Sequence, residues 1–190
     1  MREFVFGYGS LAAGDLTVRG ERNRHGFVTE LRGTRRGWGV AMDNRSDLPG
    51  YKYYLDEQGG RPAVAVCFLD IELDGPRAGR VNGVCLPVGP AELAALDLRE
   101  RNYDRIDVTD RVPDCARGRV WTYRGSIGGR SRFEDAVRAG TAVIHAGYLG
   151  SVHAGFRALG EQEWAVCAPS LEPGGLPVVE LVRRDLPSPG

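Results

Sequence analysis

The sequence predicts an α+β domain with a mixed, barrel-like sheet and flanking helices. Strand-like apolar runs follow one another through the first half of the chain, separated by clusters of glycine, proline, aspartate and asparagine. No helix-length pattern lies between them, and a parallel neighbour needs a crossover of about a dozen residues or more. These strands should therefore pair largely antiparallel, which argues against a doubly wound parallel sheet.

The expected elements follow from this pattern in chain order. An apolar run at 4–6 leads into the loop Gly7-Tyr8-Gly9-Ser10, and further strands are expected at 26–31, 37–43, 51–56, 63–71 and 81–88. A first helix is expected at 90–102, because a proline suits its first turn and strong helix formers follow. Strand-like segments at 105–108 and 119–124 and helix-like segments at 131–139 and 142–160 come next.

One domain is the default for a chain of 190 residues with 42% hydrophobic residues, which is long enough to bury a core. We expect this domain to span residues 1–168. Residues 169–190 form a tail rich in proline and glycine, which is expected to wrap the surface or to be partly disordered.

Charge and composition exclude several classes of partner. The 25 basic residues balance the 25 acidic ones, so no global field attracts nucleic acid or an anionic membrane. The first apolar run is too short for a signal peptide or a membrane span, which favours a cytoplasmic protein. The cysteines and histidines show no CxxC, HExxH or zinc-finger spacing, so no metal is expected.

The glycine loop after the first strand has three interpretations. It can be a simple tight turn, or it can belong to a dinucleotide fingerprint Gly7-x-Gly9-x-x-Ala12 with Glu30 as the ribose-binding acid. The second requires a long helix after the turn and a parallel sheet, which the following sequence does not favour. In the third, the amides of residues 8–12 form a concave nest for a small anion such as a carboxylate.

The expected helix at 90–102 carries an acid in an unusual place. At about 100° per residue, Glu100 falls between Leu93 and Leu96 on the apolar stripe, and it lies in the last turn, where the helix dipole disfavours negative charge. Both effects disfavour the charged form, as an acid that exchanges protons near neutral pH requires. Alternatively, the helix ends early and Glu100 pairs in solvent with Arg101 or Arg105.

Two ordered motifs together resemble a known family. "FGYGSL" (6–11) and "LDLRE" (96–100) resemble the glycine loop and catalytic-acid motif of the gamma-glutamylcyclotransferase superfamily, especially its ChaC-like branch. "LRGTRRGWGVAMDNR" (31–45) resembles the stretch after the second strand in that branch, and "AGYLG" (146–150) gives a weaker match. The resemblance implies a gamma-glutamylcyclotransferase-like fold.

The resemblance also implies roles for individual residues. Glu100 would be the catalytic acid/base, and Tyr8, Gly9, Ser10 and Leu11 would bind the α-carboxylate and amine of a gamma-glutamyl group, which would cyclise to 5-oxoproline. No cofactor or metal is implied. Other positions have two interpretations each. Tyr103 and Tyr148 line the pocket or only pack, Ser10 binds substrate or caps the turn, and Arg35 and Arg36 reach a second carboxylate or are solvated.

Two classes of function therefore compete. The first is an enzyme that cleaves a small gamma-glutamyl amide by cyclisation, and the second is a non-catalytic protein that binds a gamma-glutamyl or amino-acid ligand. A nicotinamide-dependent oxidoreductase is a distant third. Glu100 favours the enzyme, because burying a carboxylate between leucines is costly. The leaving group and the oligomeric state are left open.

Overall fold

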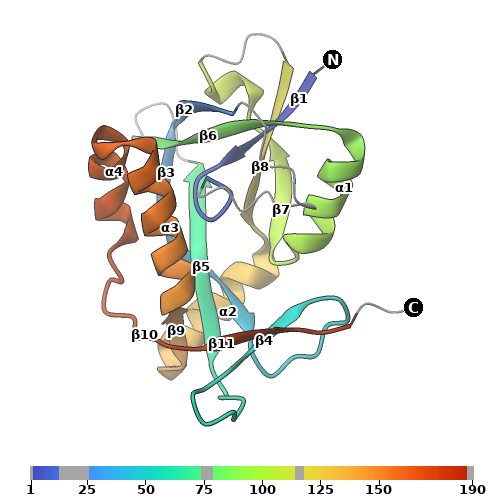
Figure 1. The fold of residues 1–190 in the computed structure, drawn as a ribbon, viewed down its shortest axis with the longest axis vertical. Coiled ribbons are helices and arrows are strands. Elements are labelled where there is room, and N and C mark those ends of the chain that lie inside the picture. The colour runs from blue at the N-terminus through green and yellow to red at the C-terminus, as the bar shows by residue number, and fades with distance from the viewer. Residues whose placement is uncertain (1, 13–25, 74–78, 114–117, 188–190) are drawn as a thin grey trace.

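The computed structural model describes residues 2–12, 26–73, 79–113 and 118–187, and it has a mixed α+β architecture (Figure 1). The strands are β1 (Arg2–Gly7), β2 (Phe27–Arg32), β3 (Thr34–Asp43), β4 (Lys52–Leu55), β5 (Ala65–Leu73), β6 (Arg80–Val88), β7 (Tyr103–Asp107), β8 (Gly118–Gly125), β9 (Ala142–His145), β10 (Val178–Val179) and β11 (Val182–Asp185). The helices are α1 (Pro90–Arg99), α2 (Ile127–Ala139), α3 (Ala146–Leu159) and α4 (Glu161–Cys167), with short 3-10 helices at Thr109–Arg111 and Ala168–Leu171.

The strands of the described residues form three sheets. A five-stranded sheet has the order β2-β6-β1-β8-β7, a four-stranded sheet has the order β10-β9-β5-β3, and β11 pairs with β4. In the first sheet β1 is antiparallel to β6 and parallel to β8, and in the second β5 is antiparallel to β3 and parallel to β9. The predicted mixed α+β class is thereby confirmed.

The main core joins the two larger sheets to α3. Phe6 of β1, Leu31 of β2 and Ile71 of β5 are fully buried and belong to one apolar cluster with Phe156 of α3. Burial of such side chains is the main favourable term in folding. The cluster therefore fixes β1, and with it the start of the glycine loop, relative to β5.

The predicted helix at 142–160 is wrong in its first residues. Residues 142–145 form β9, which pairs in parallel with β5, and α3 begins only at Ala146. Val143 and Ile144 are buried and β-branched, which suits a strand in a sheet, but periodicity alone does not separate a short apolar strand from a buried helical turn.

The carboxyl-terminal residues add strands to the sheets. β10 pairs with β9, and β11 runs antiparallel to β4, so residues 178–185 cross the lower part of the molecule in Figure 1. The sequence pattern indicated neither strand, because β10 has only two residues and all residues of β11 are exposed. Among the described residues, no helix is long and apolar enough to cross a membrane.

Candidate active site

The glycine loop begins directly at the end of β1. A Cβ atom on Gly7 would lie 2.7 Å from the Cβ of Leu11, so the chain folds back this tightly only with glycine at that position. The amide of Ala12 donates to the carbonyl of Gly9 at 3.0 Å. The amide of Ala12 is therefore not available for the expected anion nest. The amides of Gly9, Ser10 and Leu11 have no acceptor among the described residues.

A buried arginine, Arg36, holds the backbone of the glycine loop in place. Arg36 of β3 donates from Nη1 to the carbonyl of Tyr8 at 2.9 Å and from Nη2 to Oδ1 of Asn82 at 2.9 Å. Its guanidinium stacks over the ring of Phe156 at 4.8 Å. Burial lowers the pKa of Arg36. Arg36 is therefore neither solvated nor aimed at a ligand carboxylate, and it fixes the backbone of the loop; Arg35 is exposed and pairs with Glu72.

Helix α1 packs against the same loop. Pro90 occupies its first turn, and the Glu92 carboxylate accepts a hydrogen bond from the Gly89 amide at 2.7 Å, so the amino-terminal end is capped. Leu93 and Leu96 are buried in one apolar cluster with Leu11 of the loop. The apolar stripe predicted for this helix is confirmed, and it joins the loop to the helix that carries the acid.

The helix ends at Arg99, earlier than the predicted Asn102, and Glu100 is its carboxyl-terminal cap. The Glu100 amide donates to the carbonyl of Leu96 at 2.8 Å, and the Glu100 carbonyl accepts from the Tyr103 amide at 2.9 Å. The Glu100 side chain is 16% exposed, and its Oε1 accepts from Nε of Arg99 at 3.0 Å. Glu100 is thus largely buried, and its ion-pair partner is Arg99 and not Arg101 or Arg105.

Three of the predicted site residues are buried tyrosines whose pKa responds to the charge of this carboxylate. Burial raises the pKa of Tyr8, Tyr103 and Tyr148, and the negative charge of Glu100 raises each of them further. The hydroxyls of Tyr103 and Tyr148 both bond to the backbone of Leu69, and the Tyr103 amide donates to the Glu100 carbonyl, so the turn after α1 and "GYLG" of α3 meet in one region. The structure therefore brings together residues that lie far apart in the sequence.

The hydroxyls of these tyrosines are used in packing as well. Tyr8 donates to the carbonyl of Tyr123 at 2.6 Å, and Tyr103 donates to the carbonyl of Leu69 at 2.7 Å. The hydroxyl of Tyr148 accepts from the Leu69 amide at 3.4 Å, and a Cβ atom on Gly9 would lie 3.3 Å from it. The hydroxyl of Tyr148 therefore borders the loop at Gly9, and Ser10 lies half-buried in that same loop.

Sequence reasoning missed three residues of this region. Burial and the Glu100 charge raise the pKa of Tyr51, whereas for Tyr123 the largest causes are burial and the hydrogen bond to Asp97. Asp70 is buried in β5, pairs with Arg130 at 2.6 Å and adds to the raised pKa of Tyr8. An acid inside the apolar run 63–71 is the signal that could have indicated it.

An open cleft of about 230 Å³ follows β3 and β5. Its lining residues are Arg35, Arg36, Gly37, Trp38, Gly39, Asp70 and Glu72. Of the candidate residues named from the sequence, Arg35 and Arg36 line it, but Glu100, the glycine loop and the predicted tyrosines do not. The candidate site is therefore placed at the tyrosines and Glu100 and not in this cleft. In the part of the chain that the structure describes, no group of three or more His, Cys, Asp or Glu side chains is placed to hold a metal ion.

Comparisons with known proteins identify the fold. No protein-family model matches the chain, and no curated protein matches it. A solved structure described as gamma-glutamyl cyclotransferase aligns with a TM-score of 0.51 and 14% identity, covering 88% of this chain and 87% of its own.

Two further solved structures align less closely. An uncharacterized protein, loc79017 from Homo sapiens, has a TM-score of 0.49 and 17% identity over 87% of this chain and 86% of its own. A gamma-glutamyl cyclotransferase from yeast described as specific to glutathione has a TM-score of 0.43 and 15% identity over 66% of this chain and 69% of its own. The alignment with a TM-score of 0.51 shows that the chain has the fold of gamma-glutamyl cyclotransferase.

Proposed function

We propose that this protein is a gamma-glutamylcyclotransferase-type lyase of the ChaC-like branch, which converts a gamma-glutamyl amide to 5-oxoproline and a free amine. The observation that carries the proposal is the contact between the glycine loop and α1. Leu11 packs with Leu93 and Leu96, so the loop, whose amides of Gly9, Ser10 and Leu11 have no acceptor among the described residues, lies against the helix that ends at the largely buried Glu100.

The reaction needs an anion site, a base and an acid. The α-carboxylate of the substrate accepts hydrogen bonds from the amides of Gly9, Ser10 and Leu11. Glu100 takes a proton from the substrate α-amine as the amine nitrogen attacks the γ-carbonyl carbon, and a five-membered ring closes. The protonated Glu100 then returns its proton to the leaving nitrogen as the amide C–N bond breaks.

Ring closure explains why so few protein groups take part. The nucleophile and the electrophile belong to one molecule, so holding the chain of the glutamyl group in a bent conformation supplies much of the rate acceleration. Tyr103 and Tyr148 form walls of the site, with the Tyr148 hydroxyl next to Gly9 of the loop. Their hydroxyls bond to the backbone of Leu69, which keeps the rings in place when a ligand enters.

One observation favours a second candidate. The Arg99 guanidinium contacts the Glu100 carboxylate at 3.0 Å, so this carboxylate already takes part in an ion pair with a cationic group. On this basis the alternative is a non-catalytic protein in which Glu100 binds the α-ammonium group of a gamma-glutamyl or amino-acid ligand.

A single experiment separates the two. The protein is incubated with gamma-glutamyl compounds whose leaving groups are a dipeptide (as in glutathione), a free amino acid, a polyamine or a larger amine, and 5-oxoproline is measured by mass spectrometry. Parallel calorimetry measures binding of the same compounds. Release of 5-oxoproline supports the enzyme, saturable binding without release supports the binding protein, and neither result would reject both.

A further inference from the structure

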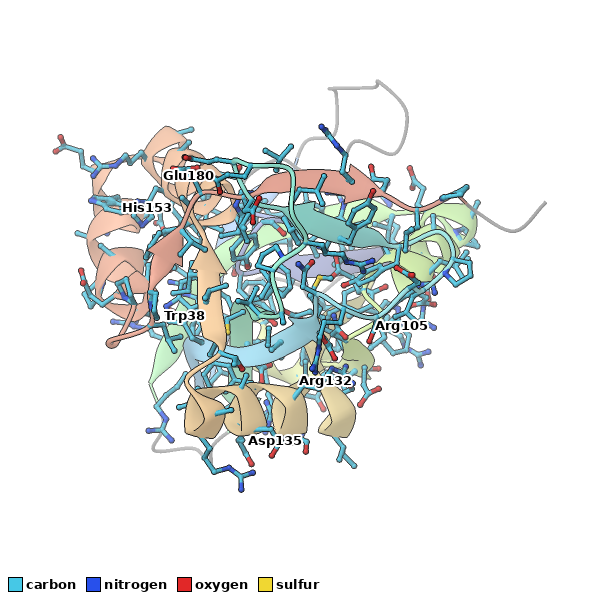
Figure 2. The ribbon with its side chains drawn as sticks, turned by 90° about the horizontal axis from the view of Figure 1, so that it is seen from below. Trp38, Arg105, Arg132, Asp135, His153 and Glu180 are labelled. Carbon is cyan, nitrogen blue, oxygen red and sulfur yellow. The ribbon has the colours of Figure 1, made fainter. Side chains whose placement is uncertain are left out.

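A buried asparagine anchors the short turn that follows Glu100. Asn102 donates from Nδ2 to the hydroxyl of Tyr51 at 2.8 Å and accepts at Oδ1 from Nη2 of Arg132 at 2.7 Å. Its carbonyl accepts from the amide of Ser126 at 2.9 Å. Figure 2 shows Arg132 on the side of α2 that faces β3. Side chains from two distant elements therefore hold a residue two positions beyond Glu100.

The carboxyl-terminal segment in turn holds Tyr51. The Leu186 amide donates to the carbonyl of Tyr51 at 2.6 Å, and the Gly50 amide donates to the carbonyl of Pro187 at 2.9 Å. β11 runs beside β4, which begins immediately after Tyr51 (Figure 1). Tyr51 is thus fixed on its backbone by the tail and on its hydroxyl by Asn102.

Tyr51 is joined to the segment that carries the acid through Asn102, two residues beyond Glu100. The ring is buried, and after burial the charge of Glu100 is the largest cause of the raised pKa of Tyr51. Asn102 donates into the Tyr51 oxygen, so the hydroxyl hydrogen remains to be donated to another acceptor. A continuous set of hydrogen bonds therefore leads from Leu186 through Tyr51 to Asn102, which lies two residues beyond Glu100.

We propose that Tyr51 is a positioning residue for Glu100, and that segment 182–187 belongs to the site because it holds Tyr51; this inference rests on the proposed function. Glu100 needs such support because of its position at the end of α1. Glu100 stands at the end of a helix, where backbone groups lose their intrahelical partners and the chain frays. A proton carrier must instead be held within a fraction of an ångström.

Tyr51→Phe tests the hydroxyl, with Tyr53→Phe as its matched control. Tyr53 lies in β4 itself, and its ring faces the guanidinium of Arg61 at 4.6 Å. We expect Tyr51→Phe to lower kcat for 5-oxoproline release about tenfold while KM stays within about twofold, since positioning affects the transition state more than binding. Tyr53→Phe should keep the kcat of the parent.

Leu186→Pro tests the tail, with Leu186→Ala as its control. Proline removes the Leu186 amide hydrogen that is donated to the Tyr51 carbonyl, and it suits an extended chain, whereas alanine keeps that hydrogen. Only Leu186→Pro should lower kcat. The double variant Tyr51→Phe/Leu186→Pro should be no slower than the slower single variant, because both changes act through one residue.

Hydrogen exchange measured by mass spectrometry gives a readout that does not depend on turnover. The amide of Tyr103 donates to the Glu100 carbonyl, and it should exchange about tenfold faster in Tyr51→Phe and Leu186→Pro than in the parent. In both control variants it should exchange at the rate of the parent. Unchanged exchange at Tyr103 in a folded Tyr51→Phe protein would overturn the inference, whatever the activity. If both variants exchange faster at Tyr103 but the parent turns over no gamma-glutamyl compound, the proposed function alone is rejected. If Leu186→Pro does not fold, Tyr51→Phe decides, because it leaves the tail intact.

Discussion

Glu100→Gln is the most direct test of the proposed mechanism. Glutamine keeps the volume of the side chain and its ability to hydrogen-bond, but its amide cannot accept the proton of an attacking amine. Loss of a positioned acid/base costs about a hundredfold or more in rate, so turnover should fall by at least that factor. Ligand binding should largely survive, because the proposal assigns the α-carboxylate to backbone amides of the loop.

The expected change in stability follows from the contacts of Glu100. The variant loses a pair with Arg99 whose two side chains are 36% and 16% exposed, which is worth about 0.5 kcal/mol in such a setting. It gains a similar amount, about 0.5 kcal/mol, because a negative charge no longer faces the carboxyl end of α1. The two effects nearly cancel, so Tm should shift by less than about 3 °C.

The assay is 5-oxoproline release measured beside a thermal melt, with Asp97→Asn as the control. Asp97 lies one turn earlier on α1, is 40% exposed, pairs with Arg105 and accepts from the Tyr123 hydroxyl, so its change to asparagine removes the same charge from the same helix and leaves Glu100 in place. Asp97→Asn should retain turnover within about threefold. A Glu100→Gln protein that keeps full activity would remove Glu100 from the mechanism, and one that melts early would mark it as structural.

Three other predictions concern binding and stability. Gly9→Val should abolish binding of a gamma-glutamyl ligand in calorimetry, because its side chain begins 3.3 Å from the Tyr148 hydroxyl and fills the space over the loop amides; unchanged affinity in the folded variant would reduce the loop to a turn. Leu96→Ala should cost about 3 kcal/mol and lower Tm by about 6–12 °C, since this side chain is 1% exposed where α1 meets the loop. Burial lowers the pKa of His145, so its stabilising contribution is complete above the ordinary value of 6.5 and is lost as the pH falls through the lower folded value. His145→Gln should therefore reduce the fall of Tm between pH 7.5 and pH 5, and an unaltered fall would contradict this sign.

Local patterns in the sequence were sufficient for several elements and for the parts of the site. Alternating apolar residues and turn residues indicated β2 to β6, and a proline followed by helix formers indicated α1, because these signals act over a few neighbouring residues. Leu93 and Leu96 were predicted on the buried stripe, with Glu100 between them. The loop at Gly7–Leu11 was recognised because only glycine allows so tight a return of the chain.

Tertiary structure decided how these parts meet. Nothing near Arg36 in the sequence indicates that its guanidinium holds the carbonyl of Tyr8, and Tyr51 gave no signal because its neighbours at the site, Asn102 and Leu186, lie far along the chain. The strand at 142–145 forms because β5 offers it a partner, which a local pattern does not contain. The sequence thus determined which residues form the candidate site, whereas their convergence depends on long-range packing and hydrogen bonding, which form only when the whole chain has folded.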